Sequence, residues 1–477
     1  MTELPPRDAY LDGRWVPADQ RFAVTDPFDG EHLADVTDCG DDLVDAAIDA
    51  SARAFASWKH RPGPERGRLL AQLAHRMLAD ERRLAEVCTR ENGKPLKESL
   101  AEVRYAASFL SWFAGEAERS YGETIPSSHA HQRIVVVREP VGPCALITPW
   151  NFPYAMLTRK IGAALAAGCT VVAKPAAQTP LSALALAQLA ADVGIPAGVI
   201  NITPSANASR TGARLLGAPA IRKVSFTGST KVGMLLMRQA ADDLKRISLE
   251  LGGNAPFVVL ADADLDAAVA GAMVAKFRNT GQSCVAANRL ILEASISEAF
   301  TTRLVAAVGK LVVGRGLDPN VDLGPVIDDA AVAKIKRLVD DAIGKGATVR
   351  FGAPPDGRSR LIAPVVLTGI TPEMQLWREE IFGPVVAIRT AADEADAIAQ
   401  ANDTEYGLVA YVYTRDAARQ VRVAEALETG MVGINEGLVS TAQAPFGGVK
   451  HSGFGREGSR HGLDDYTNLK YLATRIG

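Results

Sequence analysis

The residue with the strongest chemical potential in this sequence is Cys284, which ends the segment Gly281-Gln282-Ser283-Cys284. A cysteine thiolate is the strongest nucleophile among protein side chains. The segment separates an expected apolar helix over 265–277 from an expected strand over 290–293, so we expect Cys284 on a polar loop flanked by loop residues rather than core residues. A single cysteine is more often a buried structural residue, and the other motifs must decide between these interpretations.

Two further polar residues follow expected strands, where α/β proteins bind their ligands. Asn151 follows the strand 144–148, and its amide could donate to a developing oxyanion or could simply cap the next helix. Glu250 follows the strand 246–249 and could act as a general base, although a carboxylate at a strand end is more often only solvated. The local sequence leaves both alternatives open.

Phosphate-binding features stand at other strand ends. Lys174 ends the strand 170–173 and suits a ribose hydroxyl or a phosphate. Gly228 and Ser229 follow the strand 222–226 and open a helix, whose N–H groups and dipole can hold a pyrophosphate. The stretch 453–458 matches G-x-G-x-x-G, but no clear strand precedes it and only 19 residues follow it. We therefore reject it as a dinucleotide fingerprint.

The elements that position these residues alternate between strand and helix from residue 142 to residue 435, which predicts an α/β fold with doubly wound parallel sheets. Ahead of them lie two short strand-like runs within residues 9–25 and three expected helices, over 42–58, 64–91 and 96–117.

Two more expected strands, over 132–139 and 466–474, have no obvious sheet in this pattern. We expect them to form a protruding element that pairs with another subunit.

Composition excludes several functional classes. The 477 residues are too many for one core, and the net charge of -3 offers no basic field for nucleic acid or an anionic membrane. No apolar run reaches the ~20 residues of a membrane span, and the N-terminus lacks a signal-peptide pattern. Five scattered cysteines and seven unclustered histidines argue against a disulfide framework and a metal site, and favour a reducing cytoplasm.

Six motifs, in order along the chain from about residue 9 to the C-terminus, resemble the aldehyde dehydrogenase superfamily. They are Pro149-Trp150-Asn151-Phe152-Pro153, Phe226-Thr227-Gly228-Ser229-Thr230, Glu250-Leu251-Gly252-Gly253, Gly281-Gln282-Ser283-Cys284, Glu379-Glu380-Ile381-Phe382-Gly383-Pro384 and Pro445-Phe446-Gly447-Gly448. The resemblance implies two doubly wound α/β domains and a small β oligomerisation element, assembled as a homodimer or homotetramer. The implied cofactor-binding domain spans 1–118 and 141–249, the catalytic domain 250–440, and the oligomerisation element 119–140 and 456–477.

The resemblance also implies a role for each catalytic residue. Cys284 attacks the aldehyde carbon, and the side chain of Asn151 together with the Cys284 N–H holds the oxyanion. Hydride passes to a nicotinamide cofactor, and Glu250 activates the water that hydrolyses the resulting thioester. Relatives with a second cysteine two residues after the nucleophile can form a disulfide there, but this chain has Ala286.

The implied cofactor-binding residues are Trp150, Lys174, Ala177, Gly228, Ser229, Leu251, Glu380 and Phe382. Members that prefer NAD often carry a glutamate three residues after the lysine, where it holds the ribose 2′-hydroxyl. Here that position is Ala177, which removes the charge and bulk that would repel a 2′-phosphate. We therefore favour NADP over NAD as the cofactor.

A further set, Arg159, Arg278 and Ser440, resembles the carboxylate-binding residues of the succinate-semialdehyde dehydrogenases within that superfamily. An arginine fork binds a carboxylate with two hydrogen bonds, and Phe152 and Phe446 would pack the chain between carboxylate and aldehyde. Alternatively, the two arginines could form salt bridges with nearby acidic residues.

The expected substrate is succinate semialdehyde, with glutarate or 2-oxoglutarate semialdehyde or a broader range of aldehydes as alternatives. From other classes, a thiol hydrolase or a catalytically idle structural protein on the same fold remains open. A hydrolase would need a histidine beside Cys284, and no motif stretch contains one.

Overall fold

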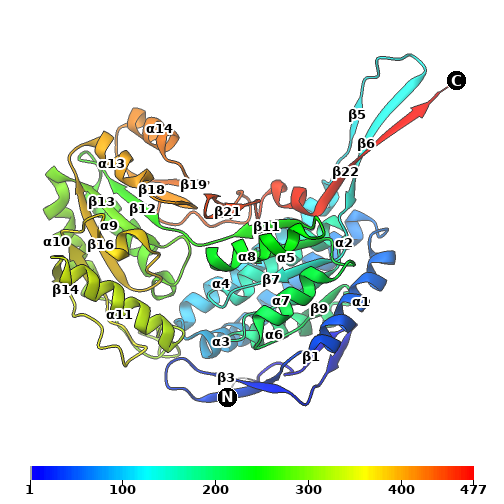
Figure 1. Cartoon of the computed structure of the whole chain (residues 1–477), viewed down its shortest axis with the longest axis horizontal. Coiled ribbons are helices and arrows are strands. Elements are labelled where there is room, and N and C mark those ends of the chain that lie inside the picture. The colour runs from blue at the N-terminus through cyan, green and yellow to red at the C-terminus, as the bar shows by residue number, and fades with distance from the viewer. Residues whose placement is uncertain (1–2, 477) are drawn as a thin grey trace.

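Two large sheets organise the chain, which the computed structural model describes from residue 3 to residue 476 (Figure 1). The first has the strand order β2-β1-β9-β8-β7-β10-β11-β21, and the second has the order β14-β15-β16-β13-β12-β18-β19. Strands β9-β8-β7-β10-β11 and β15-β16-β13-β12-β18-β19 are parallel. This confirms the prediction of an α/β fold with two doubly wound sheets.

The first sheet is built mainly from the N-terminal half of the chain. Its strands are β1 (Ala9–Leu11), β2 (Arg14–Val16), β7 (Cys144–Ile147), β8 (Val171–Lys174), β9 (Ile200–Ile202), β10 (Lys223–Thr227), β11 (Arg246–Glu250) and β21 (Gly453–Phe454). Its helices are α1 (Asp41–Trp58), α2 (Gly63–Ala79), α3 (Glu81–Asn92), α4 (Leu96–Glu118), α5 (Pro153–Ala167), α6 (Pro180–Asp192), α7 (Ala208–Gly217) and α8 (Thr230–Ala241).

The second sheet follows in the chain. Its strands are β12 (Ala255–Val259), β13 (Ala287–Glu293), β14 (Thr348–Phe351), β15 (Val365–Thr368), β16 (Val385–Ala391), β18 (Val409–Tyr413) and β19 (Met431–Ile434). Its helices are α9 (Leu265–Phe277), α10 (Ser297–Val308), α11 (Asp329–Gly344), α12 (Gln375–Arg378), α13 (Glu394–Asn402) and α14 (Ala417–Ala426). Two small antiparallel pairs complete the strands: β3 (Arg21–Thr25) with β4 (His32–Thr37), and β17 (Tyr406–Gly407) with β20 (Val449–Lys450).

Each sheet separates two apolar cores because successive strand residues point to opposite faces. In β7, Cys144 and Leu146 join the core that contains α4, α5 and α6, whereas Ala145 joins the core on the other face. In β12, Val258 and Phe257 divide in the same way between the two cores of the second sheet.

Helix α5 shows how the sequence produces a central element. Pro153 occupies its first turn, Gly168 ends it with a positive φ of 97°, and all its residues are buried. The helix packs against α2, α4 and α6, so it carries Arg159 and Lys160 into the interior. Charged residues in such a place need partners from elsewhere in the chain.

Some expected elements differ from the structure. The helix expected over 64–91 is divided at Asp80, whose carboxylate accepts a hydrogen bond from Arg83 (Oδ2 to Nε, 2.8 Å) as α3 begins. We did not expect β12, whose second residue is Pro256, nor the antiparallel pairing of β21 with β11.

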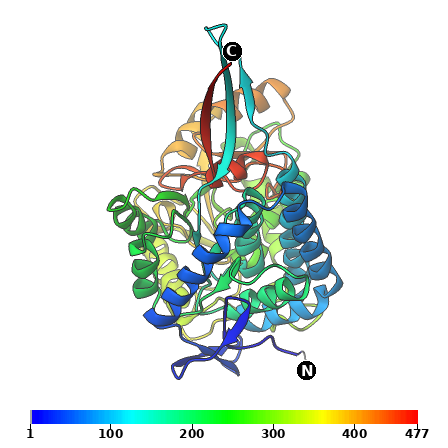
Figure 2. The same cartoon turned by 90° about the vertical axis from the view of Figure 1, so that its right-hand side faces the viewer.

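A narrow β-arm projects from the rest of the chain (Figures 1 and 2). It consists of β5 (Glu123–Ile125), β6 (Gln132–Pro140) and β22 (Thr467–Arg475) in the order β22-β6-β5. The two strands that lacked a partner in the sequence pattern pair with each other, antiparallel along their whole length. Their pairing with another subunit and the expected domain boundaries stay predictions. Between residues 3 and 476, no helix has both the length and the apolar character that a bilayer crossing requires.

Candidate active site

Cys284 lies on the loop between α9 and β13, and the backbone of this loop is held in an unusual shape. Asn279, Thr280 and Gly281 have consecutive positive φ values of 51°, 57° and 76°. The left-handed conformation costs roughly 1–2 kcal/mol for a residue other than glycine, so it persists only where other contacts fix it. The Asn279 N–H donates to Glu98 Oε2 (2.6 Å), and a Cβ on Gly281 would collide with a backbone carbonyl.

The residues that precede Cys284 are buried, contrary to the expectation of a solvated loop. Gln282 is 0% exposed. Its side chain accepts from the Ile327 N–H (2.9 Å) and donates to the carbonyl oxygens of Asn279 and Pro325. A buried amide with all these partners acts as a core residue, so the nucleophile stands on a rigid support.

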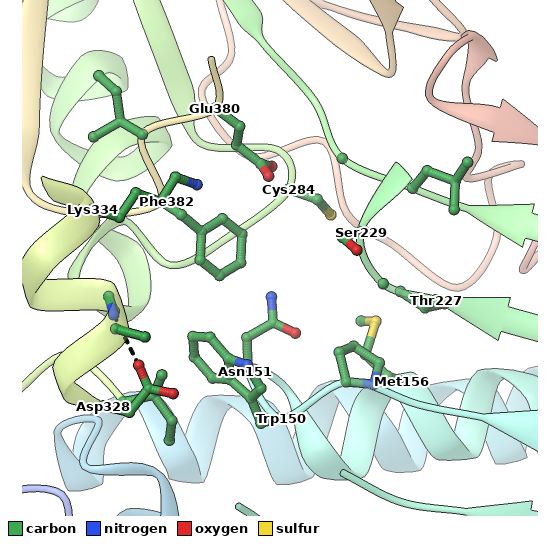
Figure 3. A pocket seen from close by; sticks show the side chains of 18 residues that line it. Trp150, Asn151, Met156, Thr227, Ser229, Cys284, Asp328, Lys334, Glu380 and Phe382 are labelled. Atoms are coloured by element: carbon green, nitrogen blue, oxygen red, sulfur yellow. Dashed lines mark hydrogen bonds between the residues drawn. The ribbon is translucent and has the colours of Figure 1, made fainter. Parts of the chain in front are cut away.

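Asn151 points its side chain into the same cavity as Cys284 (Figure 3). Its Nδ2 donates to the Gln282 carbonyl oxygen (3.1 Å), which leaves its second N–H available. The residue before α5 is Phe152, and the first-turn N–H groups of Tyr154 and Ala155 donate to Glu102 Oε1 (2.9 and 3.3 Å) rather than to Asn151. The capping alternative for Asn151 is therefore wrong.

A cavity of about 340 Å³ opens in front of Cys284, between the ends of the two sheets (Figure 3). Trp150 and Phe382 meet across it edge to face, with ring centroids 5.6 Å apart. Its walls contain most of the expected cofactor-binding residues together with others that we did not anticipate. The expected ones are Trp150, Gly228, Ser229, Leu251, Glu380 and Phe382, and the others include Met156, Thr227, Asp328 and Lys334.

The walls have features that suit a dinucleotide. Ser229 caps α8 through its hydroxyl, so the first turn of this helix presents its N–H groups toward the cavity edge. The Glu380 carboxylate accepts from the Gly253 N–H (3.1 Å), which orients it at the cavity wall. An apolar cleft that ends in a helix N-terminus fits an adenine, a pyrophosphate and a nicotinamide in turn.

Two expected cofactor residues lie outside these walls. Lys174 is buried, and its Nζ donates to the Pro175 carbonyl oxygen (3.1 Å). Burial lowers the pKa of Lys174 to about 8, against the opposing charge of Asp38. Ala177 lines a neighbouring cavity of about 320 Å³, which shares Ile327 and Asp328 with the first.

The surroundings of both reacting groups raise their pKa values, with Glu250 buried and Cys284 partly exposed to the cavity. Burial, and second the charge of Glu380, raise the pKa of Cys284 to about 12. Burial, and second the charge of Glu457, raise the pKa of Glu250 well above its usual range. Neither carboxylate oxygen of Glu250 has a hydrogen-bond partner among the described residues. The Cys284 thiol therefore carries its proton at neutral pH and depends on a base for activation.

A buried ionic cluster lies behind Glu250. The Glu457 carboxylate receives Lys160 Nζ (2.5 Å) and Arg159 Nη1 (3.2 Å). Burial alone would raise the pKa of Glu457, but these two cations outweigh it and hold the pKa below its usual range. Arg159 is thus paired with an acid, as the salt-bridge alternative stated.

The expected substrate residues surround a second, much narrower cavity of about 20 Å³, which also reaches Cys284. Its lining residues are Tyr105, Phe152, Met156, Arg159, Arg278, Ser283, Cys284, Val285, Ser440 and Phe446. The Arg278 guanidinium lies 4.7 Å from the Phe152 ring centroid and 5.7 Å from that of Tyr105. It has no acidic partner within 4 Å in the stretch 3–476, so the salt-bridge alternative does not hold for Arg278.

Sequence reasoning missed Tyr105, Lys160 and Glu457 as members of the site. One signal was available for the ionic cluster, because adjacent Arg159 and Lys160 on an apolar helix require a carboxylate. Glu457 stood in the glycine-rich stretch 453–458, which we had set aside.

The chain is similar to several known proteins. The model of the aldehyde dehydrogenase family matches residues 15–472. The succinate-semialdehyde dehydrogenase (NADP+) of Escherichia coli (strain K12) is 50% identical over 98% of this chain and 97% of its own length. A glutarate-semialdehyde dehydrogenase of Pseudomonas aeruginosa is 49% identical over the same shares. The crystal structure of a succinate-semialdehyde dehydrogenase from Burkholderia pseudomallei superposes with a TM-score of 0.97 at 49% identity, covering 99% of this chain and 98% of that one. The chain belongs to the aldehyde dehydrogenase family.

Proposed function

We propose that this protein oxidises a short aldehyde that carries a carboxylate, with NAD(P)+ as the hydride acceptor, and that succinate semialdehyde is the best substrate. The observation that carries the proposal is a half-buried arginine, Arg278, which lies in the cavity that ends at Cys284 and has no carboxylate within 4 Å among residues 3–476. Removing such a cation from water costs free energy unless a nearby anion compensates its charge. A substrate with an aldehyde at one end and a carboxylate at the other would satisfy both ends of the cavity.

Cys284 carries out the first chemical step. Its sulfur adds to the aldehyde carbon, and the thiol proton leaves to a base. The oxyanion that forms accepts a hydrogen bond from the second N–H of Asn151, which Gln282 orients. Loss of one such donor typically lowers the rate ~10²–10³-fold. The residues that line the larger cavity would hold the nicotinamide cofactor, which would supply the acceptor for the hydride that leaves the substrate carbon.

Glu250 serves the second step. The cysteine thioester is hydrolysed when a water molecule loses a proton to the Glu250 carboxylate and attacks the carbonyl carbon. The raised pKa of Glu250 makes its carboxylate form a stronger base toward this water. The sulfur then leaves, and the acid product departs from the narrow cavity.

NADP is the cofactor we favour. Ala177 places neither charge nor bulk where a glutamate would hold a ribose 2′-hydroxyl, and the related E. coli enzyme is named for NADP+. The implied holders of the cofactor are Trp150, Lys174, Gly228, Ser229, Leu251, Glu380 and Phe382.

Glutarate semialdehyde is the second candidate, since a relative at 49% identity is a glutarate-semialdehyde dehydrogenase. Succinate semialdehyde stays the first candidate because the E. coli relative at 50% identity is a succinate-semialdehyde dehydrogenase. A thiol hydrolase is disfavoured because no histidine lines either cavity beside Cys284.

The proposal also covers the oligomeric state and the cellular location of the protein. We infer a homodimer or homotetramer because the arm exposes large apolar side chains, with Leu469 at 65% and Tyr471 at 59% exposure. A cytoplasmic location suits the five cysteines, all of which are free thiols.

Initial rates of cofactor reduction test the proposal. Succinate semialdehyde, glutarate semialdehyde and butanal are each assayed with NADP+ and NAD+, using wild type and Cys284→Ala. We expect the highest kcat/KM with succinate semialdehyde and NADP+, and no turnover by C284A. A wild type that prefers butanal to both acids would overturn the substrate assignment, and turnover by C284A would overturn the role of Cys284.

A further inference from the structure

Tyr105 stands between the two arginines of the narrow cavity. It comes from α4, and it lines the cavity together with both arginines. Its hydroxyl oxygen accepts a hydrogen bond from Arg159 Nη2 (2.7 Å). Its ring centroid lies 5.7 Å from the guanidinium carbons of both Arg159 and Arg278.

Both terminal nitrogens of the Arg159 guanidinium donate to the protein, whereas its buried Nε has no hydrogen-bond partner among the described residues. Nη1 donates to Glu457, Nη2 donates to Tyr105, and the guanidinium lies 4.5 Å from the Phe446 ring centroid. The side chain is 1% exposed. A substrate carboxylate that approached Arg159 directly would compete with Glu457 for the same cation. The charge of Arg159 therefore reaches the cavity mainly through the group to which it donates.

The Tyr105 hydroxyl can itself donate a hydrogen bond. The phenol oxygen is the acceptor for Arg159, and the Tyr105 O–H finds no acceptor of its own in the described part of the chain. A guanidinium that donates to a phenol oxygen draws electron density from it and makes its O–H a stronger donor, as in other hydrogen-bond chains. The ring is also held in place, since Tyr105 and Phe109 pack edge to face with centroids 4.9 Å apart.

We propose that Tyr105 is a substrate-binding residue that selects aldehydes with an acid tail: its O–H donates to the substrate carboxylate while Arg278 supplies the neighbouring charge. The inference rests on the proposed function and deepens it. Arg159 then acts as a positioning residue, which holds the Tyr105 oxygen and polarises its O–H. The substrate carboxylate then accepts the two-pronged hydrogen bond of the Arg278 guanidinium and one hydrogen bond from the neutral Tyr105 hydroxyl.

The test compares Tyr105→Phe with wild type on succinate semialdehyde and on butanal, which has the same carbon count but no carboxylate. The variant keeps the ring and its packing on Phe109, and Tyr471→Phe on the exposed arm is the matched control. We expect Y105F to raise KM for succinate semialdehyde about 10- to 100-fold, the range for a hydrogen bond to a charged group, with kcat changed less than about threefold. Butanal kinetics should stay within about twofold in both variants.

A binding measurement supplies an independent readout. Calorimetric titration with succinate, the acid product, should give a Kd that rises with the same factor in Y105F and not in Y471F. Equal changes in KM for both aldehydes, or an unchanged Kd for succinate, would overturn the assignment of Tyr105. If Y105F proved unstable, Tyr105→Met would replace it, with the same criteria. A wild type without any preference for acid aldehydes would instead contradict the proposed function, so the two failures are distinguishable.

Discussion

Two cavities meet at Cys284, and they are built in different ways. The larger one, of about 340 Å³, is walled by strand ends, the start of α8 and apolar side chains. The narrow one, of about 20 Å³, is walled by charged and aromatic side chains from α4, α5, the loop after α9 and the segment around Ser440. The first can hold a large ligand through backbone groups, and the second can select a small one through charge.

The two sides also differ in their electrostatics. Burial lowers the pKa of Lys174, an expected cofactor-binding residue outside the walls of the larger cavity, to about 8. On the substrate side one cation, Arg159, is paired inside the protein, whereas Arg278 has no acidic partner within 4 Å among residues 3–476. Substitutions that act on one side only should therefore separate binding of the cofactor from selection of the aldehyde.

Among substitutions that affect only one of the two cavities, Arg278→Met in the narrow cavity is expected to have the largest effect on activity. This change removes the cation that meets the carboxylate, so kcat/KM for succinate semialdehyde should fall ~10²–10³-fold, as for one partner of a buried charge pair. Steady-state rates with succinate semialdehyde and with butanal measure it, and butanal should change less than about threefold. Arg238→Met, on the exposed face of α8, is the control and should behave as wild type. Equal losses with both aldehydes would remove the distinction between the two cavities.

Ala177→Glu should act on the cofactor side alone. A carboxylate near the ribose repels a 2′-phosphate and offers an acceptor to a 2′-hydroxyl, so the ratio of kcat/KM for NADP+ to that for NAD+ should fall ~10–100-fold. The ratio is measured at saturating succinate semialdehyde. The preference for succinate semialdehyde over butanal should not move, and a ratio unchanged by the substitution would remove Ala177 from the cofactor site.

The smallest effect is a pH dependence. The Lys174 cation is present below a pKa of about 8 and is lost as pH rises through that value. KM for NADP+ should therefore increase several-fold between pH 7 and pH 9, because each unit above the pKa leaves ~10-fold less cation. KM for the aldehyde, followed in the same buffers, reports the other cavity. Lys174→Gln should weaken cofactor binding at pH 7 and flatten the pH profile, and an unchanged profile would contradict the assignment.

The cofactor side was largely predictable from sequence. Cys284, Asn151 and Gly228 each follow or precede a strand, and parallel strands bring such residues to one edge. The motif residues Trp150, Glu380 and Phe382 indeed line the same cavity.

The substrate side was less predictable because its contacts join distant parts of the chain. Arg159 and Glu457 are 298 residues apart. The adjacent Arg159 and Lys160 indicate that a carboxylate is needed, but no local sequence pattern predicts which one. Tyr105 lies on a helix whose apolar spacing indicated only packing. The burial of Gln282 was missed for the same reason, since its partners Ile327 and Pro325 lie in a separate loop.

The most direct test of the central claim traps the substrate on the nucleophile. The variant Glu250→Gln keeps the shape of the side chain but cannot take a proton from water, so the thioester should accumulate after one turnover. The variant is given equal concentrations of succinate semialdehyde and butanal with NADP+, and the mass of the Cys284 peptide is measured. We predict one reduced cofactor per active site and a succinyl adduct that exceeds the butyryl adduct at least ~100-fold. Equal adducts, or a predominant butyryl adduct, would contradict the account.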